Sequence, residues 1–260
     1  MLRPRIIPCL LVRGGGLVKT VQFDESKYVG DPINAVRIFN EKEVDELIVV
    51  DIDATAQNRE PDYGLVRNLA AECRMPLCYG GGVKTVDQFQ KIISLGVEKV
   101  AISSAAVEMP ELITEAARCV GSQSVVVVMD VKKAGLIRRY ELFTNNGNKG
   151  TAIGPADFAK RVEALGAGEL VVNSIECDGQ MRGYDINLIA KVREATSLPM
   201  TVLGGAGSLG DIADLIRRFQ IIGAAAGSLF VFKGKYRAVL INYPQPEEKD
   251  TLVKEAMGCA

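Results

Sequence analysis

Short apolar runs alternate with amphipathic segments along the whole of this 260-residue chain. Eight such runs can be counted, and most are rich in β-branched residues and nearly free of charge, which is typical of strands buried on both faces of a parallel sheet. Each segment between two runs has the periodicity of a helix and the length of a crossover. The alternation predicts an α/β protein, and the length suits a closed (β/α)8 TIM barrel. An open, doubly wound sheet is the alternative interpretation.

The expected elements follow from these patterns and from capping signals. Strands are expected at residues 6–12, 46–51, 75–78, 99–102, 124–130, 169–173, 200–203 and 221–225. Helices are expected at 32–41, 61–72, from 85 onward, 109–119, 154–165, 185–195, 209–219 and, more weakly, 247–257. Asp31 is the expected cap of the first helix, with Pro32 at its first position, and a glycine-rich loop containing Lys19 is expected before it.

The two halves of the chain resemble each other. LIVVDIDATAQ from Leu47 aligns with LVVNSIECDGQ from Leu170, and the same shift, within a residue, superposes two glycine-rich turns. A slightly smaller shift places Leu11 on Asp130. An internal half-barrel repeat explains these matches and favours the closed barrel.

The glycine turns, YGGG and LGGAG, each follow a strand and precede a helix. Without a Cβ atom, backbone N–H groups can approach an anion, and a helix N-terminus adds free donors and a positive dipole end. A second small-residue turn, AISSA or AAAGS, follows in each half, so the pattern predicts a ligand with a phosphate at both ends. For any single glycine, a tight βα turn explains the residue equally well. The predicted phosphate-binding residues are Gly81, Gly82, Ser103, Ser104, Gly179, Gly204, Gly205, Gly227 and Ser228.

The composition excludes several classes of protein. A net charge of −1 with 24% charged residues indicates one globular domain over residues 1–260 and argues against nucleic acid as a partner. The chain has no histidine, and its six cysteines form no C-x-x-C pair, so neither a metal site nor a cofactor is expected. No apolar run approaches the roughly 20 residues of a membrane span, and no signal peptide is recognisable, which favours the cytoplasm.

Eight stretches of the chain carry a resemblance to a known family. In their order and spacing, these stretches resemble the cyclase subunit of imidazole glycerol phosphate synthase. They are RIIPCL, VGDP, DELIVVDI, YGGGVKT, AAVEMPELI, GSQSVVVVMDVK, GAGELVVNSIECDGQMRGYD and LGGAGS. The resemblance implies a heterodimer in which a glutaminase subunit docks at the barrel bottom and supplies ammonia through the barrel. At the top, ammonia cleaves and cyclises a bisphosphorylated ribulosyl aminoimidazole. The products are imidazole glycerol phosphate, for histidine biosynthesis, and an aminoimidazole carboxamide ribotide.

The same resemblance implies two facing catalytic acids, on the first and fifth strands. The fifth-strand acid is Asp130, and Lys19 is also kept, but Leu11 stands at the position of the other acid. Cyclisation moves several protons, which leucine cannot carry. An active cyclase would need a substitute acid, for which the candidates are Asp51, Glu176 and Asp178.

At the opposite end of the barrel the family pattern is complete. Arg5, Glu46, Lys99 and Glu169 match the ring of charged residues that gates ammonia entry in the family. Without the resemblance, a network that only stabilises the fold would be the preferred interpretation of these four residues.

Family paralogues that keep this gate and lose the first acid resemble the chain further, in LLV, YVGDPINAVRIFNEKEVDELI and GSLFVFKGKYRAVLINYP. They accompany a second glutaminase and serve an N-acetyl-sugar amidotransferase in surface-polysaccharide (O-antigen) synthesis. The sequence therefore favours an ammonia conduit over an active cyclase. Residues from about 233 to 260 depart from the long eighth helix of the family and could meet the additional partner.

Overall fold

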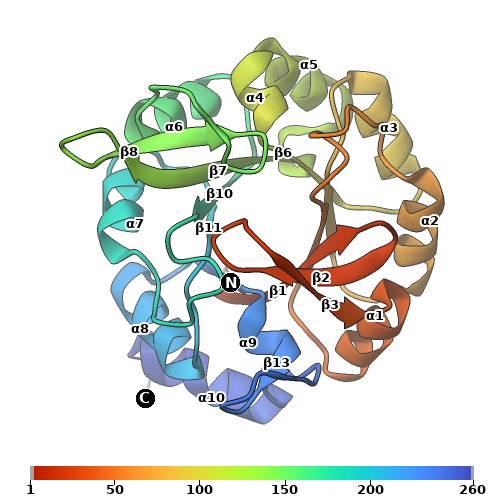
Figure 1. The fold of residues 1–260 in the computed structure, drawn as a ribbon, viewed down its shortest axis with the longest axis vertical. Helices are drawn as coiled ribbons and strands as arrows, with labels where there is room; N and C mark the ends of the chain where they lie inside the picture. Colours follow the sequence, from red (N-terminus) through yellow and green to blue (C-terminus); the bar gives the residue numbers. More distant parts are fainter. Residues whose placement is uncertain (1–2, 259–260) are drawn as a thin grey trace.

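The apolar runs form a closed parallel barrel in the computed structural model, which describes residues 3–258 (Figure 1). The barrel strands pair in the order β1-β4-β5-β6-β7-β10-β11-β12, and β12 pairs back to β1. The predicted (β/α)8 barrel is confirmed, and the open sheet is excluded because the ring closes. The strands are β1 (Arg5–Arg13), β4 (Leu47–Asp51), β5 (Leu77–Gly80), β6 (Lys99–Ile102), β7 (Val125–Ala134), β10 (Glu169–Ser174), β11 (Met200–Leu203) and β12 (Gly223–Ala226).

Helices surround the barrel and follow the strands in turn. The N-terminal signals act as predicted: the Asp31 side chain accepts from the N–H of Asn34 at 2.8 Å, and Thr85 forms a capping box with Gln88. The buried helix faces pack on the outside of the barrel through large side chains such as Phe39 and Phe89. The outer helices are α1 (Pro32–Glu41), α2 (Tyr63–Glu72), α3 (Val86–Ser94), α5 (Glu111–Val120), α6 (Pro155–Ala164), α7 (Ile186–Arg193), α8 (Leu209–Phe219) and α10 (Pro246–Met257).

Further strands extend the barrel at its C-terminal end, where a loop was expected after the first strand. β1 continues through a tight turn into β2 (Gly16–Thr20), which pairs with β3 (Ser26–Gly30). β7 runs past its predicted end at residue 130 and pairs with β8 (Arg139–Thr144), which pairs with β9 (Lys149–Gly150). Two short helices, α4 (Ser104–Glu108) and α9 (Ser228–Val231), and a 3-10 turn, η1 (Ser122–Ser124), complete the connections.

The C-terminal segment contains a small hairpin followed by the last outer helix. β13 (Phe232–Lys233) pairs with β14 (Ala238–Val239), and the helix predicted at 247–257 is present as α10, packed beside α8. Lys249 of α10 is buried, with its Nζ 2.8 Å from Asp45 and 3.0 Å from the carbonyl of Glu43. The segment predicted to diverge from the family is thus a hairpin followed by a helix, and its divergence remains a prediction. The final two residues of the expected segment, including Cys259, lie outside the described residues.

The interior of the barrel holds its own apolar cluster, separate from the core under the helices. Along each strand, side chains that point into the barrel alternate with side chains that point outward. On β1 the inward residues begin with Arg5 at the N-terminal end of the strand and include Leu11 near its C-terminal end. The interior cluster comprises Ile7, Cys9, Ile48, Cys78, Ala101, Val126, Val171 and Ala225. Polar side chains border this interior cluster, hereafter the apolar column, at both ends. The barrel axis therefore passes through two separate groups of polar residues.

Candidate functional site

A cavity of about 290 Å³ lies at the C-terminal ends of the barrel strands. All eight parallel strands end at this face, so the loops that follow them converge here, as in other TIM barrels with an active site. Its apolar lining includes Cys9, Ile48, Cys78, Ala101 and Val171, which belong to the interior cluster. Its polar lining includes Lys19, Asp51, Ser104, Asp130 and Asp178. The cavity therefore joins the apolar column to a group of titratable side chains.

Asp130, on β7, is held by two donors. Asn173 Nδ2 donates to Oδ1 at 2.8 Å, and Ser103 Oγ donates to Oδ2 at 2.9 Å. Burial raises the pKa of Asp130 to about 6, against the effect of these hydrogen bonds, and the negative charge of Asp178 adds to the rise. A carboxyl group that titrates near neutral pH is suited to exchange protons with a ligand.

Leu11 occupies the corresponding inward position on β1, where the family pattern has an acid. It is partly buried, lines the same cavity and packs against the interior apolar cluster. Three strands separate β1 from β7 in either direction around the ring, so the two residues lie on opposite walls. Asp130 therefore faces an apolar side chain where the family resemblance predicts a second carboxylate.

The three substitute acids have different surroundings. Glu176 pairs with Arg138 at 2.6 Å and is not part of the cavity lining. Asp51 lines the cavity, but one of its oxygens accepts from the N–H groups of Asp53 and Ala54 at 3.0 and 3.1 Å and so fixes the loop after β4. Asp178 lines the cavity, and burial raises its pKa while the nearby Lys19 opposes the rise. Asp178 is thus the best placed of the three to act with Asp130.

Lys19 lies on β2 and is buried. Its Nζ donates to the carbonyl of Cys9 at 2.7 Å. A Cβ atom at Gly227 would lie 1.9 Å from this nitrogen, so glycine is needed there to admit the ammonium group. Gly227, which the sequence predicts as a phosphate ligand, thus has a packing role in this structure.

The structure brings only the first-half phosphate residues into the cavity wall. Gly81, Gly82, Ser103 and Ser104 line it, whereas Gly179 and the second-half set do not. The hydroxyl of Ser103 donates its hydrogen bond to Asp130, and Ser104 Oγ accepts a hydrogen bond from the N–H of Asn145 at 3.2 Å.

Close packing accounts for several of these glycines. A Cβ at Gly82 would lie 2.7 Å from the carbonyl oxygen of Arg59, and one at Gly205 would lie 2.0 Å from that of Gly183. Gly179 is packed in the same way on the carbonyl of Thr20, at 2.6 Å. Their role in binding phosphate remains a prediction.

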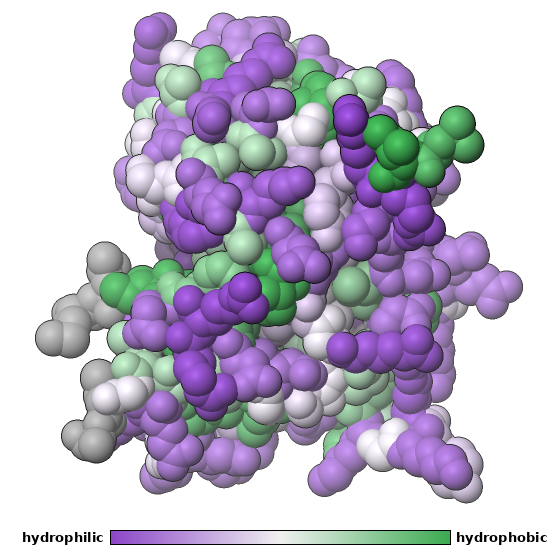
Figure 2. All heavy atoms as spheres, turned by 90° about the vertical axis from the view of Figure 1, so that its left-hand side faces the viewer, coloured by the Kyte–Doolittle hydropathy of each residue, from purple (hydrophilic) through white to green (hydrophobic). Residues whose placement is uncertain are grey.

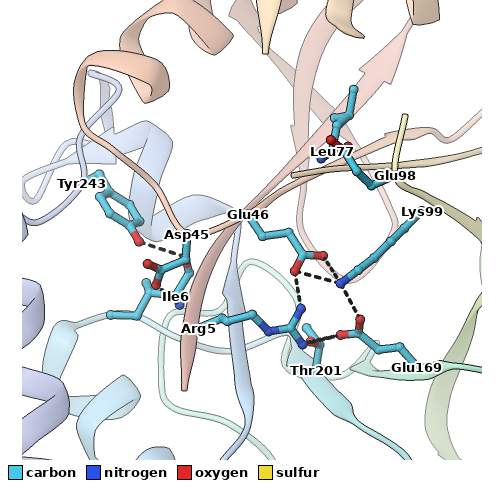
Figure 3. A network of polar contacts seen from close by, with 10 residues as sticks. All are labelled: Arg5, Ile6, Asp45, Glu46, Leu77, Glu98, Lys99, Glu169, Thr201 and Tyr243. Atoms are coloured by element: carbon cyan, nitrogen blue, oxygen red, sulfur yellow. Dashed lines mark hydrogen bonds and ion pairs between the residues drawn. The ribbon is translucent and has the colours of Figure 1, made fainter. Parts of the chain in front are cut away.

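At the other end of the barrel, the four predicted gate residues form a closed ring of alternating charge (Figure 3). Arg5 bonds Glu46 and lies 2.7 Å from Glu169, and Lys99 lies 2.8 Å from Glu46 and 2.7 Å from Glu169. Thr201 Oγ1 also donates to Glu169, at 2.6 Å. Burial lowers the pKa of Lys99, but Glu169 and Glu46 outweigh it and hold the pKa above its ordinary value. Burial raises the pKa of Glu169, but Arg5 and Lys99 outweigh it and hold that pKa below its ordinary value, so Glu169 and Lys99 both carry their charges at neutral pH.

Two further features bear on ligands and surroundings. Within residues 3–258, no group of three or more His, Cys, Asp or Glu side chains is arranged to hold a metal ion. Among the helices that the structure describes, none is both long and apolar enough to span a membrane.

The barrel, its acidic cavity and its charged ring define a (β/α)8-barrel protein with an enzyme-type site at the C-terminal face. The family of histidine biosynthesis proteins matches residues 5–237. Over 249 residues the chain is 57% identical to "Putative imidazole glycerol phosphate synthase subunit hisF3" of Vibrio vulnificus, covering 96% of both chains. It is 51% identical over 250 residues to the "hisF2" subunit, also named putative, of Pseudomonas aeruginosa, covering 96% of this chain and 99% of the relative. It is 41% identical over 230 residues to "Imidazole glycerol phosphate synthase subunit HisF" of Alkaliphilus metalliredigens, covering 88% and 91%. The chain therefore belongs to the HisF family of cyclase subunits of imidazole glycerol phosphate synthase.

Sequence reasoning missed the residue that holds Asp130 from β10. Asn173 is buried, and its Oδ1 has no partner among the described residues. The alternation along β10 could have indicated Asn173, because Glu169, Val171 and Asn173 share the inward face of this strand. Ser103 was assigned to phosphate, and its contact with Asp130 could not be read from spacing alone.

Proposed function

We propose that this chain receives ammonia from a glutaminase partner and conducts it through the barrel to an N-acetyl-sugar amidotransferase of surface-polysaccharide synthesis, without cyclase chemistry of its own. The observation that carries the proposal is the combination of a complete charged ring with Leu11 opposite Asp130. The parts needed to admit and conduct ammonia are kept, whereas one of the two acids needed for cyclisation is replaced.

The apolar column suits passage of neutral ammonia. Transfer of a charged ammonium ion into such surroundings is very costly, whereas ammonia carries no charge. Burial raises the pKa of the Cys9 thiol to about 11 and that of Cys78 well above its ordinary value, so both thiols are uncharged at neutral pH. Among the described residues, the interior cluster thus offers no anion that would trap ammonium between the ring and the cavity.

The names of the relatives support a second-copy role. Two of them carry numbered names, hisF2 and hisF3, as expected for additional copies of one gene. These names mention no sugar. The assignment to sugar amidation therefore depends on the motifs shared with the paralogues and on Leu11.

The test is reconstitution with the glutaminase and the amidotransferase. We expect amidated sugar from glutamine only when this chain is present, whereas ammonium salt alone should support the amidotransferase without it. Glutamine-dependent product that forms equally well without the chain would contradict the proposal.

Active cyclase is the second candidate function, because Asp130 and Asp178 share the cavity and both have raised pKa values. Such a pair could divide the acid and base roles. The purified chain would be supplied with ammonium salt and the ribulosyl bisphosphate intermediate, with Asp178→Asn as the comparison. Turnover near that of an ordinary HisF subunit, lost in the variant, would establish the cyclase and overturn the conduit.

A further inference from the structure

The β7–β8 hairpin presents two aliphatic side chains to solvent on the C-terminal side of the barrel. β7 runs toward the C-terminal face and continues beyond it, so the turn between Ala134 and Arg139 stands clear of the barrel. Leu136 is fully exposed and Ile137 is 68% exposed. The hairpin extends on the left in Figure 1, and Figure 2, which views that side, shows a hydrophobic tip on a largely hydrophilic face. Exposed apolar patches that are rimmed by polar residues often mark sites of protein interaction.

Aromatic side chains are exposed on two other hairpins, β2–β3 and β13–β14, which we call projections together with the β7–β8 hairpin. Tyr236, in the turn between β13 and β14, is 89% exposed, and Tyr28 on β3 is 66% exposed. These two projections touch: Lys27 Nζ donates to the carbonyl of Arg237 at 3.3 Å and lies 5.2 Å from the ring centre of Phe232. Tyrosine is enriched where proteins bind one another, because it offers a large apolar area with one polar end.

The loop after β10 joins the projections into one surface. Arg138, at the tip of the β7–β8 hairpin, pairs with Glu176 at 2.6 Å, and Arg237 Nη2 donates to the carbonyl of Gly179 at 3.1 Å. Gln22, between β2 and β3, donates to the carbonyl of Glu176 at 2.8 Å. Asp178 of the same loop lines the cavity. We call the four exposed side chains on this surface the exit rim: Tyr28, Leu136, Ile137 and Tyr236.

The stretches that carry Leu136, Ile137 and Tyr236 are basic, although Glu176 pairs with Arg138 and the β2–β3 turn carries Asp24 and Glu25. Residues 132–139 contain four lysines and arginines, residues 233–237 contain three, and neither stretch contains an acid, although the whole chain has a net charge of −1. A second copy of this chain would bring the same cations against these, so self-association through the rim is disfavoured.

We propose that the exit rim is the docking surface for an ammonia-consuming protein whose own surface is acidic around apolar pockets. The inference rests on the proposed function. Ammonia that leaves the cavity into water is diluted and largely protonated at neutral pH, so delivery is efficient only if the acceptor covers the mouth while it reacts. Leu136, Ile137 and Tyr236 are the anchors, and the lysines and arginines beside them attract and orient the partner.

The test uses the full chain with its glutaminase and the purified N-acetyl-sugar amidotransferase as probe. The variant is Leu136→Asp with Ile137→Asp, and a second variant is Tyr236→Asp. The control adds the same two charges on the outer helices, by Asn68→Asp on α2 and Gln90→Asp on α3, which are exposed. We expect the rim variants to bind the amidotransferase about 10 to 100 times more weakly than the wild type and the control. Glutamine-dependent product should fall in parallel, while glutaminase binding and ammonium-dependent product stay unchanged.

Three outcomes separate the possibilities. Rim variants that bind and deliver like the wild type would overturn the rim while leaving the conduit intact. A wild-type chain that supports no glutamine-dependent product would instead refute the proposed function. Cosedimentation with vesicles of equal parts phosphatidylcholine and phosphatidylserine, lost in the rim variants, would show that the rim binds a membrane and would overturn the protein partner.

Discussion

Leu11 and Asp130 line opposite walls of the same cavity, on barrel strands that lie four positions apart in a ring of eight. Around them the cavity retains a buried cation, Lys19, and a second acid, Asp178. The departure from the family's two-acid pattern is thus local, which makes the consequence of the single change at Leu11 measurable.

Replacing Leu11 by aspartate is expected to give measurable ammonia-dependent turnover of the ribulosyl intermediate. A positioned acid or base contributes roughly 10² to 10⁴ in rate, and the glycine-rich turn after β1, which has no side chains at Gly14 to Gly16 to contact the ligand, should hold the gain near the lower end. The new carboxylate would raise the pKa of one member of the pair, so activity should depend on pH more steeply than stability does. The measurement is steady-state turnover with ammonium salt.

The matched control for this variant is Leu203→Asp, which makes the same change on another wall of the cavity. It should fold and remain inactive. If Leu11→Asp is folded, binds the bisphosphate and still shows no turnover, the loss of cyclase chemistry is spread over the loops.

Asp130 should destabilise the barrel at neutral and alkaline pH. Its pKa is raised to about 6 from 3.8, so between these values the folded state binds more protons than the unfolded state and stability falls as pH rises. Asp130→Asn should therefore raise the free energy of unfolding at pH 8 by up to about 3 kcal/mol, with roughly half of that gain left at pH 5. Urea unfolding at the two pH values measures the difference. An effect of equal size at both would show that burial of the charge is not its cause.

The positions of strands and helices could be predicted closely because period and capping are local properties. The strand at Lys99–Ile102 and the helix at Leu209–Phe219 match the predicted bounds, whereas β5 begins two residues later than expected, because Pro76 has no N–H with which to begin the pairing. The β2–β3 hairpin was missed because Gly14 to Gly16 suggested a glycine-rich loop. In the structure two short strands follow these glycines, and the ring of Tyr28 fills the space over Gly16.

The site was harder to predict than the fold because its contacts join distant strands. Asp130 and the four ring residues could be named from the sequence, because the family resemblance assigns them. The bonds from Ser103 and Asn173 to Asp130 could not, because they depend on side-chain rotamers across the barrel end. The glycines illustrate the same limit: spacing indicated phosphate, while the carbonyls packed against Gly82 and Gly205 come from loops far away in sequence.

Removing the ring lysine should affect both stability and ammonia transfer. Lys99→Ala leaves Glu46 and Glu169, both nearly buried, with only Arg5 between them, which is expected to cost about 3 kcal/mol. If the ring is a gate, the ratio of glutamine-dependent to ammonium-dependent product should also change. Lys249→Ala is the control, since it breaks another buried ion pair, with Asp45, outside the ring. A ratio that stays constant in both variants would leave the ring a purely structural role.

Phosphate binding is best tested at the serines that begin the two short helices, because side chains at Gly82 or Gly205 would collide with backbone carbonyls and disturb folding. Ser104 and Ser228 are buried and lie within the two small-residue turns. Ser104→Asp and Ser228→Asp each place a negative charge where the sequence predicts a phosphate group, so each should weaken binding of the bisphosphate by about tenfold or more through repulsion and lost hydrogen bonds. The exposed Ser94→Asp on α3 is the control for the added charge. Titration calorimetry with the bisphosphate and with inorganic phosphate measures the effect.

If only Ser104→Asp weakens binding, then the second-half turn, which does not line the cavity, has kept its glycines for packing alone, and the ligand is held by one phosphate. Unchanged binding in both variants would remove the phosphate assignment from both turns.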